Sequence, residues 1–376
     1  MKRTKIVFFI YEMGAGGAAR TLLNIMNNLN RDEYEPMVVT LNVNGSYEHL
    51  IDSDIPLIKL PTKRLSRTVF KLAKLIRKHD VDIVFSTIHR VNAIATIAKL
   101  LSFSKAKNIV READNLGGTW KVDITLPIYG IVYRFSDQVV SLSQGVKNNL
   151  AKKYKLKPKD IEVVYNPVDV AAIQTLAAEN LPDDHYEIYE TEEKVIITAG
   201  RLVEQKDHAT LLRAFAAVKK ELPARLVILG EGHLQAELEE QAREFGVDKS
   251  VHFIGFQHNP YNYFARADLF VLSSKHEGFS HVLAESLAAG TPVVSANCKS
   301  GPAEVLADGK YGYLCPVGDD QQMAAAMIKQ LKKTDTEQQK DISAGVTRAN
   351  QFRADKIVKE YEQVFQKVLT GSKGQG

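Results

Sequence analysis

Two glutamates around a short turn are the residues of this sequence best placed for chemistry. In KHEGFSHVLAESLAAGTPVV (275–294), Glu277 precedes a Gly-Phe-Ser turn at 278–280, and Glu285 lies in the helical pattern that follows. Ser280 is a candidate helix cap, and free N–H groups at a helix start suit an anion such as a phosphate. Two carboxylates along one ligand favour a polyol such as a sugar and a ribose, although the residues also fit a capped helix with two structural acids.

Two cations follow an earlier strand-like run. KVIITAGRLVEQKDH places Arg201 and Lys206 shortly after the apolar residues at 195–199. Because ligands of doubly wound sheets bind beyond the carboxyl ends of the strands, both cations are candidates to clamp a diphosphate. As isolated residues they would equally fit an ordinary surface.

A glycine-rich turn follows the first strand-like run. GAGGAAR, from Gly14 to Arg20, matches G-x-G-x-x-A and raises an NAD-binding interpretation. That fingerprint also requires an acid after the second strand, where VVTLNVNG offers only Asn42 and Asn44. The turn therefore indicates close backbone approach to an anionic ligand, or only a tight turn.

The elements that carry these turns alternate between strand-like and helical patterns. This rhythm predicts an α/β protein of two doubly wound domains, at 1–170 and 186–350, with ligands in a cleft between them. The acid-rich segment 171–193 breaks the rhythm and is interpreted as a linker or irregular crossing. A helix at 353–370 is expected to pack back on the first domain through one apolar face: Ile357, Val358, Tyr361, Val364, Phe365 and Val368.

Composition is that of a soluble two-domain protein. The chain has 376 residues, and its first apolar run, KIVFFI, is too short for a signal peptide. Two cysteines, Cys298 and Cys315, match neither a disulfide framework nor a metal cluster, so the cytoplasm is the expected location. Two D-x-D sequences, at 52–54 and 80–82, lie in a polar loop and at a strand entry. We therefore expect no metal site.

Positive charge is concentrated in the first half of the chain. Residues 1–180 carry 26 Lys and Arg against 17 Asp and Glu, whereas the remainder carries 23 against 28. Much of the excess lies at 62–79 and 151–160. The first run predicts a basic amphipathic helix that contacts an anionic membrane surface through residues 63–78 or simply covers the sheet. Nucleic acid is not expected, because no aromatic platform accompanies the charge.

Several stretches together resemble the retaining glycosyltransferases of family 4, the glycosyl transferases group 1, which have the GT-B fold. The matching pieces, densest over 195–320, are GAGGAAR, SDQVVSLSQGVKNNL, VVYNPVD, ITAGRLVEQKD, LVILGEGHLQAELEE, HFIGF, EGFSHVLAESLAAGTPVVSA and SGPAEVLADGKYGYLCPVGD. In this order and spacing they are specific.

The resemblance implies a role for each matching position. Arg201 and Lys206 would hold the donor diphosphate, while Glu277 would face the sugar hydroxyls and Glu285 the ribose. The resemblance makes Glu277, Arg201 and Lys206 the expected catalytic residues. The other expected donor-binding positions are Gly278, Phe279 and Ser280, whose backbone would line the sugar and phosphates, and Gly16 and Gly17, which would approach the donor phosphates from the first domain.

Two positions depart from the family pattern. Ala19 stands where many relatives have a glutamate, and Ala113, in VREADN, stands where many have a histidine near the acceptor. Both lie in the first domain, so the acceptor side departs while the donor motifs are intact. Asp114 is an alternative group for the acceptor.

The resemblance implies transfer of a hexose or N-acetylhexosamine from a nucleotide-sugar to a lipid-linked or polysaccharide acceptor in cell-surface glycan biosynthesis. The stretch SGPAEVL resembles stretches in transferases that use UDP-sugars, so a UDP-sugar is the expected donor. No cofactor or metal is expected. The expected location is the cytoplasm, peripherally on the inner face of the cytoplasmic membrane. A nucleotide-sugar epimerase of the same fold and a non-catalytic membrane-binding protein are the alternatives.

Overall fold

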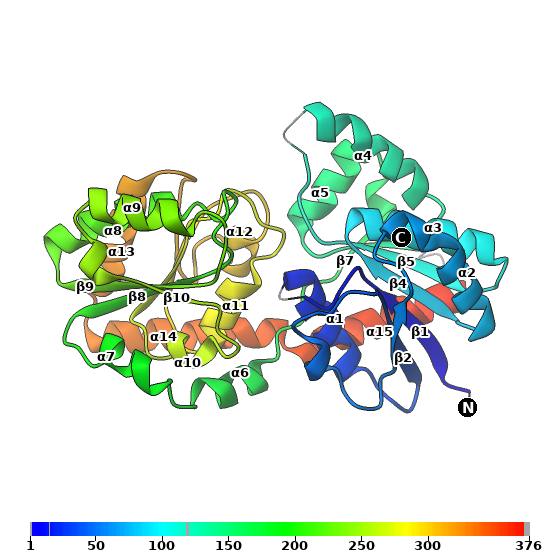
Figure 1. The fold of residues 1–376 in the computed structure, drawn as a ribbon, viewed down its shortest axis with the longest axis horizontal. Coiled ribbons are helices and arrows are strands. Elements are labelled where there is room, and N and C mark those ends of the chain that lie inside the picture. Colours follow the sequence, from blue (N-terminus) through cyan, green and yellow to red (C-terminus); the bar gives the residue numbers. More distant parts are fainter. Residues whose placement is uncertain (1, 15, 118–119, 372–376) are drawn as a thin grey trace. The chain divides into compact units, whose positions relative to one another are not determined.

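The computed structural model describes residues 2–14, 16–117 and 120–371 of this chain (Figure 1). They form two compact units, of which unit 1 comprises Met1–Pro167 with Ala354–Gly376 and unit 2 comprises Val168–Arg353. Unit 2 therefore starts earlier than the expected residue 186. No described helix is both long enough and apolar enough to span a bilayer.

Unit 1 is built on a parallel sheet with the order β3-β2-β1-β4-β5-β6-β7. Its strands are β1 (Thr4–Phe9), β2 (Tyr34–Leu41), β3 (Leu57–Leu60), β4 (Ile83–Thr87), β5 (Lys107–Glu112), β6 (Gln138–Ser141) and β7 (Ile161–Val163). Its α-helices are α1 (Gly17–Asn28), α2 (Val69–Lys78), α3 (His89–Ser102), α4 (Trp120–Tyr133), α5 (Gln144–Lys153) and α15 (Ala354–Thr370). Short 3-10 turns are η1 (Glu48–Leu50), η2 (Leu65–Arg67) and η3 (Pro158–Asp160).

Successive strand residues in unit 1 enter two different cores, because side chains of a strand alternate between the faces of the sheet. Ile6 and Phe8 of β1 pack with α1 and α15, whereas Val7 and Phe9 pack with α2 and α3. All six apolar residues predicted on the final helix belong to the first of these cores. Burial of that face fixes α15 in unit 1, although it follows unit 2 in the sequence.

Unit 2 has a parallel sheet with the order β10-β9-β8-β11-β12-β13. Its strands are β8 (Lys194–Ala199), β9 (Ala224–Leu229), β10 (Val251–Gly255), β11 (Leu269–Leu272), β12 (Val293–Ala296) and β13 (Tyr313–Cys315). Its α-helices are α6 (Val170–Ala177), α7 (Tyr186–Tyr189), α8 (His208–Glu221), α9 (Gln235–Glu244), α10 (Tyr261–Phe264), α11 (His281–Ala288), α12 (Pro302–Val305), α13 (Asp320–Leu331) and α14 (Asp335–Ala349). Its 3-10 turns are η4 (Asp183–His185), η5 (Asp248–Ser250) and η6 (Asn350–Phe352).

Helices cover both faces of the unit 2 sheet, as Figure 1 shows. Helices α8, α9 and α13 bury their apolar residues against one face. Helices α6, α7, α10, α11 and α14 lie on the other side. The two sheets, with helices on both faces, confirm the predicted α/β class.

The segment predicted as a linker is instead an ordered part of unit 2. It contains most of α6, together with η4 and α7. The amides of Asn259 and Asn262 donate hydrogen bonds to the Leu176 and Asn180 carbonyl oxygens, at 2.8 and 3.0 Å. Acidic composition suggested a linker, but the apolar residues of α6 bury against the rest of unit 2, Val170 and Ile173 among them.

Candidate functional site

The candidate site of unit 2 lies where the direction of strand succession reverses. β8 pairs with β9 on one side and with β11 on the other, with Leu269 beside Ile196. Such a switch point leaves a crevice beyond the carboxyl ends of the two central strands. Arg201 and Lys206 follow β8, and Glu277 follows β11, so both expected groups come from this edge.

Lys206 and Glu277 form the closest charged contact of the site. Lys206 Nζ donates to Glu277 Oε1 at 2.6 Å, and their side chains are only 16% and 11% exposed. The loops that carry them are also tied together, since Ser273 Oγ donates to the Lys206 carbonyl oxygen at 2.8 Å and the Lys275 amide to Gln205 O at 2.8 Å. Partial burial strengthens such a pair relative to an exposed one.

The Gly-Phe-Ser turn is buried and tightly enclosed. Ser280 has φ 68° and ψ 61°, and its side chain does not cap α11, so the capping prediction was wrong. A side chain at Gly301 would meet the Phe279 carbonyl at 2.8 Å and Ser280 Oγ at 2.9 Å, so the close approach of Gly301 holds the turn. Among the described residues Ser280 Oγ is buried without a hydrogen-bond partner.

Glu285 lies one turn inside α11, half-buried. Its Oε1 accepts a hydrogen bond from the hydroxyl of Tyr261, on α10, at 3.2 Å. Sequence reasoning missed Tyr261, because the aromatic run YNYF carries no motif. The contact orients the Glu285 carboxylate, whose oxygens are acceptors for hydroxyl groups.

Arg201 lies at the same sheet edge but is not paired with these groups. Its side chain is exposed, and no ion pair joins it to another of the described residues. Gly200, just before it, approaches the Lys206 stem closely, since a Cβ there would lie 3.2 Å from Lys206 Cε. The structure thus brings Lys206 and Glu277 together and leaves the Arg201 guanidinium facing solvent.

Cys298 is a further residue near this pair that sequence reasoning did not place in the site. It follows β12 and is buried, and burial together with the negative charge of Glu277 raises the pKa of its thiol to about 12. The thiol is therefore neutral near pH 7. It contributes packing beside Glu277 and has no nucleophilic role in its protonated form.

Gly16 and Gly17 lie in unit 1, at the turn between β1 and α1. Gly16 precedes α1, and a Cβ built there meets no atom within 4 Å, so its backbone is open to close approach. Ala15 lies outside the described residues. Ala19 is buried in the unit 1 core, which accommodates a methyl group at this position.

The stretch VREADN spans the end of β5 and the loop after it, and it contains the buried acid Glu112. Glu112 accepts hydrogen bonds from the hydroxyls of Tyr133 and Tyr154, at 2.7 and 3.3 Å, and from the Ala113 amide at 3.1 Å. Burial raises the pKa of Glu112 to about 7. Asp114 Oδ1 accepts from the Asn115 amide at 2.7 Å, which shapes the loop.

The unit 1 switch point between β1 and β4 adds a residue that the sequence did not indicate. Ile88, which follows β4, has φ 78°, an unfavourable value for a β-branched residue. His89 then begins α3 and contacts the Tyr129 ring edge-on, with centroids 5.2 Å apart. Burial lowers the pKa of His89, so its imidazole is neutral near pH 7.

The D-x-D acids have local partners. Asp52 and Asp54 both pair with Arg31, at 3.2 and 2.7 Å, and Asp80 pairs with Lys2 at 2.9 Å. Asp82 accepts from the Lys5 amide at 2.9 Å. Over the described parts of the chain, no three His, Cys, Asp or Glu side chains cluster in a way that could hold a metal.

The basic run at 62–79 forms η2 and α2. Leu72, Leu75 and Ile76 are buried against the sheet, and Leu65 and Val69 pack beside them. The apolar stripe is therefore occupied by the protein itself. The cations of this run are all exposed: Lys63, Arg64, Arg67, Lys71, Lys74, Arg77 and Lys78.

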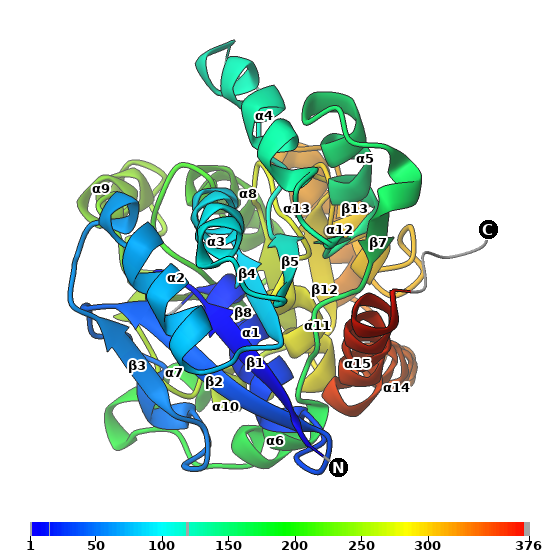
Figure 2. The same ribbon diagram turned by 90° about the vertical axis from the view of Figure 1, so that its right-hand side faces the viewer.

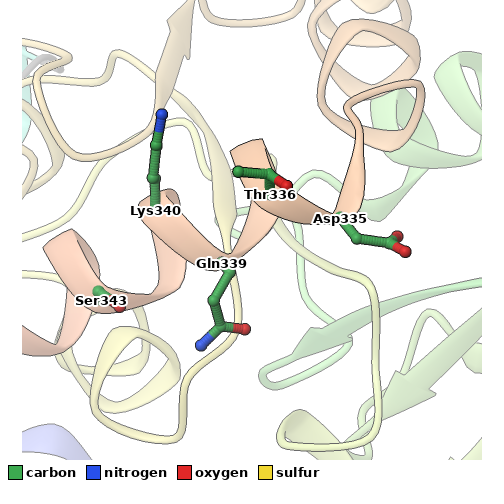
Figure 3. A pocket seen from close by; sticks show the side chains of 5 residues that line it. All are labelled: Asp335, Thr336, Gln339, Lys340 and Ser343. Carbon is green, nitrogen blue, oxygen red and sulfur yellow. The ribbon is translucent and has the colours of Figure 1, made fainter.

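A shallow hollow on α14 is separate from these groups. It has a volume of about 670 Å³ and is lined by Asp335, Thr336, Gln339, Lys340 and Ser343 (Figure 3). All five come from a single helix, and none belongs to the switch-point site. Their character is that of a solvated helix face.

Known families match nearly the whole chain. The family described as Glycosyltransferase Family 4 matches residues 15–172, and Glycosyl transferases group 1 matches residues 184–346. A Campylobacter jejuni protein named N-acetylgalactosamine-N,N'-diacetylbacillosaminyl-diphospho-undecaprenol 4-alpha-N-acetylgalactosaminyltransferase is 30% identical over 95% of this chain and 98% of its own. The N-acetyl-alpha-D-glucosaminyl L-malate synthase of Bacillus anthracis is 30% identical over 81% of this chain and 79% of its own.

Solved structures agree on the architecture. Anabaena Alr3699/HepE, crystallised in complex with UDP-glucose, superposes with a TM-score of 0.83 at 20% identity, over 97% of this chain and 100% of that chain. At this identity the likeness speaks for the fold, and it confirms the predicted GT-B fold of two doubly wound units.

Proposed function

Because this chain belongs to the glycosyltransferases of group 1 and family 4, we propose that it transfers a hexose or N-acetylhexosamine from a UDP-sugar, with retention of anomeric configuration, to a lipid-linked or polysaccharide acceptor in cell-surface glycan biosynthesis. The observation that carries the donor side is the Lys206–Glu277 pair at the switch point of unit 2, beside the start of α11.

The donor is proposed to lie along the edge formed by the ends of β8 and β11. Its sugar hydroxyls contact Glu277, its ribose contacts Glu285, and its diphosphate lies between them near Lys206 and Arg201. The start of α11 contributes backbone amides and a partial positive charge beside the phosphates. HepE, which shares the fold, was crystallised with UDP-glucose, and this supports a uridine nucleotide.

The chemical step exchanges one bond at the anomeric carbon for another. The bond to the diphosphate oxygen breaks and leaves its electron pair on that oxygen, while the acceptor hydroxyl forms the new bond from the same face. The hydroxyl proton passes to the departing phosphate. Lys206 and Arg201 face the charge that develops there, so they stabilise the transition state more than the bound donor.

The acceptor is proposed to be lipid-linked, at the inner face of the cytoplasmic membrane. The Campylobacter relative is named for a diphospho-undecaprenol acceptor, whereas the Bacillus relative is named for malate, so the family alone leaves both kinds open. The seven exposed cations at 63–78 favour the lipid-linked kind, since they suit an anionic membrane surface.

A panel of radiolabelled nucleotide-sugars, incubated with the protein with and without membrane extract, tests this proposal. We expect label from one UDP-sugar to enter the lipid fraction only when protein and extract are both present. Label that stays in free nucleotide-sugar with an altered sugar would instead identify an epimerase. Intact donor with every sugar and extract would contradict transferase activity toward these acceptors.

A further inference from the structure

Helix α4 is rich in large apolar residues, yet only some of them are buried. Leu126 and Tyr133 bury into unit 1, and between them Gly130 approaches Tyr154, the residue that follows α5. A Cβ at Gly130 would lie 1.8 Å from the Tyr154 carbonyl oxygen, so backbone meets backbone there. The Tyr133 hydroxyl also donates to Glu112. These contacts fix α4 and determine which side faces outward.

The outward side of α4 carries large apolar side chains at helical spacing. They lie opposite the buried positions. These residues are more than half exposed: Trp120 71%, Ile124 62%, Ile128 60%, Ile131 55% and Phe135 59%. Phe135 lies two residues after the end of the helix, in the turn that follows it. We call these five residues the α4 ridge. Figure 2 shows α4 standing out from the remainder of unit 1. An exposed row of large apolar side chains usually marks a surface that contacts a partner or lipid.

Exposed cations are carried by elements near α4, at the end of α5 and after it and, beyond α3, on α2. Helix α5, which packs against α4, leads into a second basic run whose exposed lysines are Lys152, Lys155, Lys157 and Lys159. Helix α3 packs against both α4 and α2, and α2 carries exposed cations. Asp123, the acid within α4, is paired with Lys153 at 2.7 Å. An apolar ridge with basic segments nearby complements an anionic lipid surface.

Helix α2 supplies charge and one exposed aromatic side chain, Phe70, while the rest of its apolar stripe is buried on the sheet. We infer that the α4 ridge inserts into the interfacial layer of an anionic bilayer, with the nearby lysines on the lipid headgroups. Trp120, at the start of the helix, suits the headgroup level, where tryptophan is enriched in membrane proteins. This inference rests on the proposed function, which requires access to a lipid-linked acceptor.

Trp120 is the only tryptophan of the chain, so its fluorescence reports on the ridge without any substitution. We expect anionic phosphatidylglycerol vesicles to move its emission to shorter wavelength, and brominated acyl chains in those vesicles to quench it. Neutral phosphatidylcholine vesicles should do much less. Unchanged emission and no quenching with anionic vesicles at low ionic strength would overturn the inference. An emission shift that occurs without lipid, together with a dimer in sedimentation, would also overturn the inference, because a second copy of the chain would then cover the ridge.

Two variants separate insertion from charge. Ile124→Ser with Ile128→Ser should lower vesicle partitioning about a hundredfold, because burial of each isoleucine is worth about one tenfold step. The residual binding should be released by salt. The matched control is Leu50→Ser, because Leu50 is an exposed apolar residue of unit 1 that lies away from the ridge. Its carbonyl oxygen accepts a hydrogen bond from the Asn27 side chain of α1, which covers the other face of the sheet. Partitioning of the double variant equal to that of Leu50→Ser would contradict insertion.

Calorimetric UDP binding by the same proteins distinguishes this inference from the donor proposal. The ridge substitutions lie in unit 1, so UDP affinity should be unchanged in both variants. Vesicle binding without UDP binding by the natural protein would count against the proposed donor and not against the ridge. UDP binding with no vesicle response would count against the ridge and not against the proposed donor.

Discussion

The Lys206–Glu277 pair is the residue-scale feature with the clearest consequence. Each side chain gives the other a charged partner in a partly buried place, at 2.6 Å. In the proposed complex Lys206 also faces the diphosphate, whereas Glu277 faces the transferred sugar. The pair would then orient both groups before the donor arrives, which reduces the reorganisation needed at the transition state.

Removal of the donor cations should weaken nucleotide binding. In a double variant that combines Arg201→Ala and Lys206→Ala, each substitution should weaken UDP binding and transition-state stabilisation by about 2 kcal/mol, the size of one charge-assisted hydrogen bond. Calorimetry with UDP measures the first effect and kcat/KM the second. Lys194→Ala is the control, because Lys194 begins the same strand at its opposite end and pairs with Asp268. Wild-type UDP affinity in a folded double variant would contradict the assignment.

The two glutamates should fail in different ways. Glu277→Gln should lower sugar turnover while UDP binding is retained, because its proposed partner belongs to the transferred group. Glu285→Gln should weaken UDP itself, because its proposed partner is the ribose. Calorimetry with UDP beside steady-state rates separates the two, and an equal loss of UDP affinity in both variants would refute the division.

Glu112 should make the stability of unit 1 depend on pH. Burial raises its pKa from 4.5 to about 7, so the folded state binds more protons than the unfolded state between these values. The free energy of unfolding should fall by about 3 kcal/mol as pH rises from about 4.5 to about 7. Chemical denaturation at pH 4.5 and 7.5 measures this. Glu112→Gln, which stays neutral, should lose that contribution, and an identical pH dependence in both proteins would contradict it.

At the scale of elements, the central strands can be recognised in the sequence, whereas several peripheral elements cannot. β1, β4, β8 and β11 are continuous apolar runs because both of their faces are buried. The short strands β3 and β13, at the edges of the sheets, give no clear signal in the sequence. Helix α4 is also hard to recognise, because its apolar residues are spread around the helix and give no helical period, and Pro127 and Gly130 interrupt the pattern.

The positions of site residues could be predicted where they follow the end of a strand. They could not be predicted where they depend on packing between distant segments. Lys206 and Glu277 follow adjacent parallel strands, so their proximity follows from topology. The left-handed backbone of Ser280 depends on Gly301, which is distant in sequence, and the Glu285 contact depends on Tyr261 of α10. No local pattern encodes such contacts.

The cations of the basic run at 62–79 should govern electrostatic attraction to a membrane. Replacement of Lys63, Arg64, Arg67 and Lys71 with Gln should reduce sedimentation with anionic vesicles, because each cation near such a surface contributes about 1 kcal/mol. UDP binding should be unaffected. High salt should weaken wild-type association as the substitutions do. Equal sedimentation of both proteins at low salt would show that α2 only covers the sheet.

At the scale of the whole molecule, unit 1 is completed by a distant part of the chain. The buried guanidinium of Arg111 on β5 donates to the Tyr361 hydroxyl of α15 at 3.0 Å and to Thr87 Oγ1 at 3.0 Å, and it also bonds Asn166. No carboxylate is among these partners. The contacts fasten the C-terminal helix to β4, β5 and the last residues before unit 2.

Deletion of residues 354–371 should unfold unit 1 selectively. The loss exposes the core beneath α15 and leaves Arg111 without one of its partners, whereas unit 2 keeps all of its strands. Limited proteolysis should digest the unit 1 sequence and leave a resistant fragment near 168–353. A truncated protein as resistant as the full chain would show that α15 is dispensable. Tyr361→Phe is a milder companion, which removes one hydrogen bond and keeps the ring.

The position of α15 also has a consequence for synthesis on the ribosome. Domains usually fold in the order in which they emerge, the N-terminal one first. Here the first half of the chain must wait, because the helix that closes its core leaves the exit tunnel only after all of unit 2 has been translated. The nascent unit 1 therefore spends that interval with an open apolar face, the natural place for a chaperone to bind, while unit 2 can finish before it.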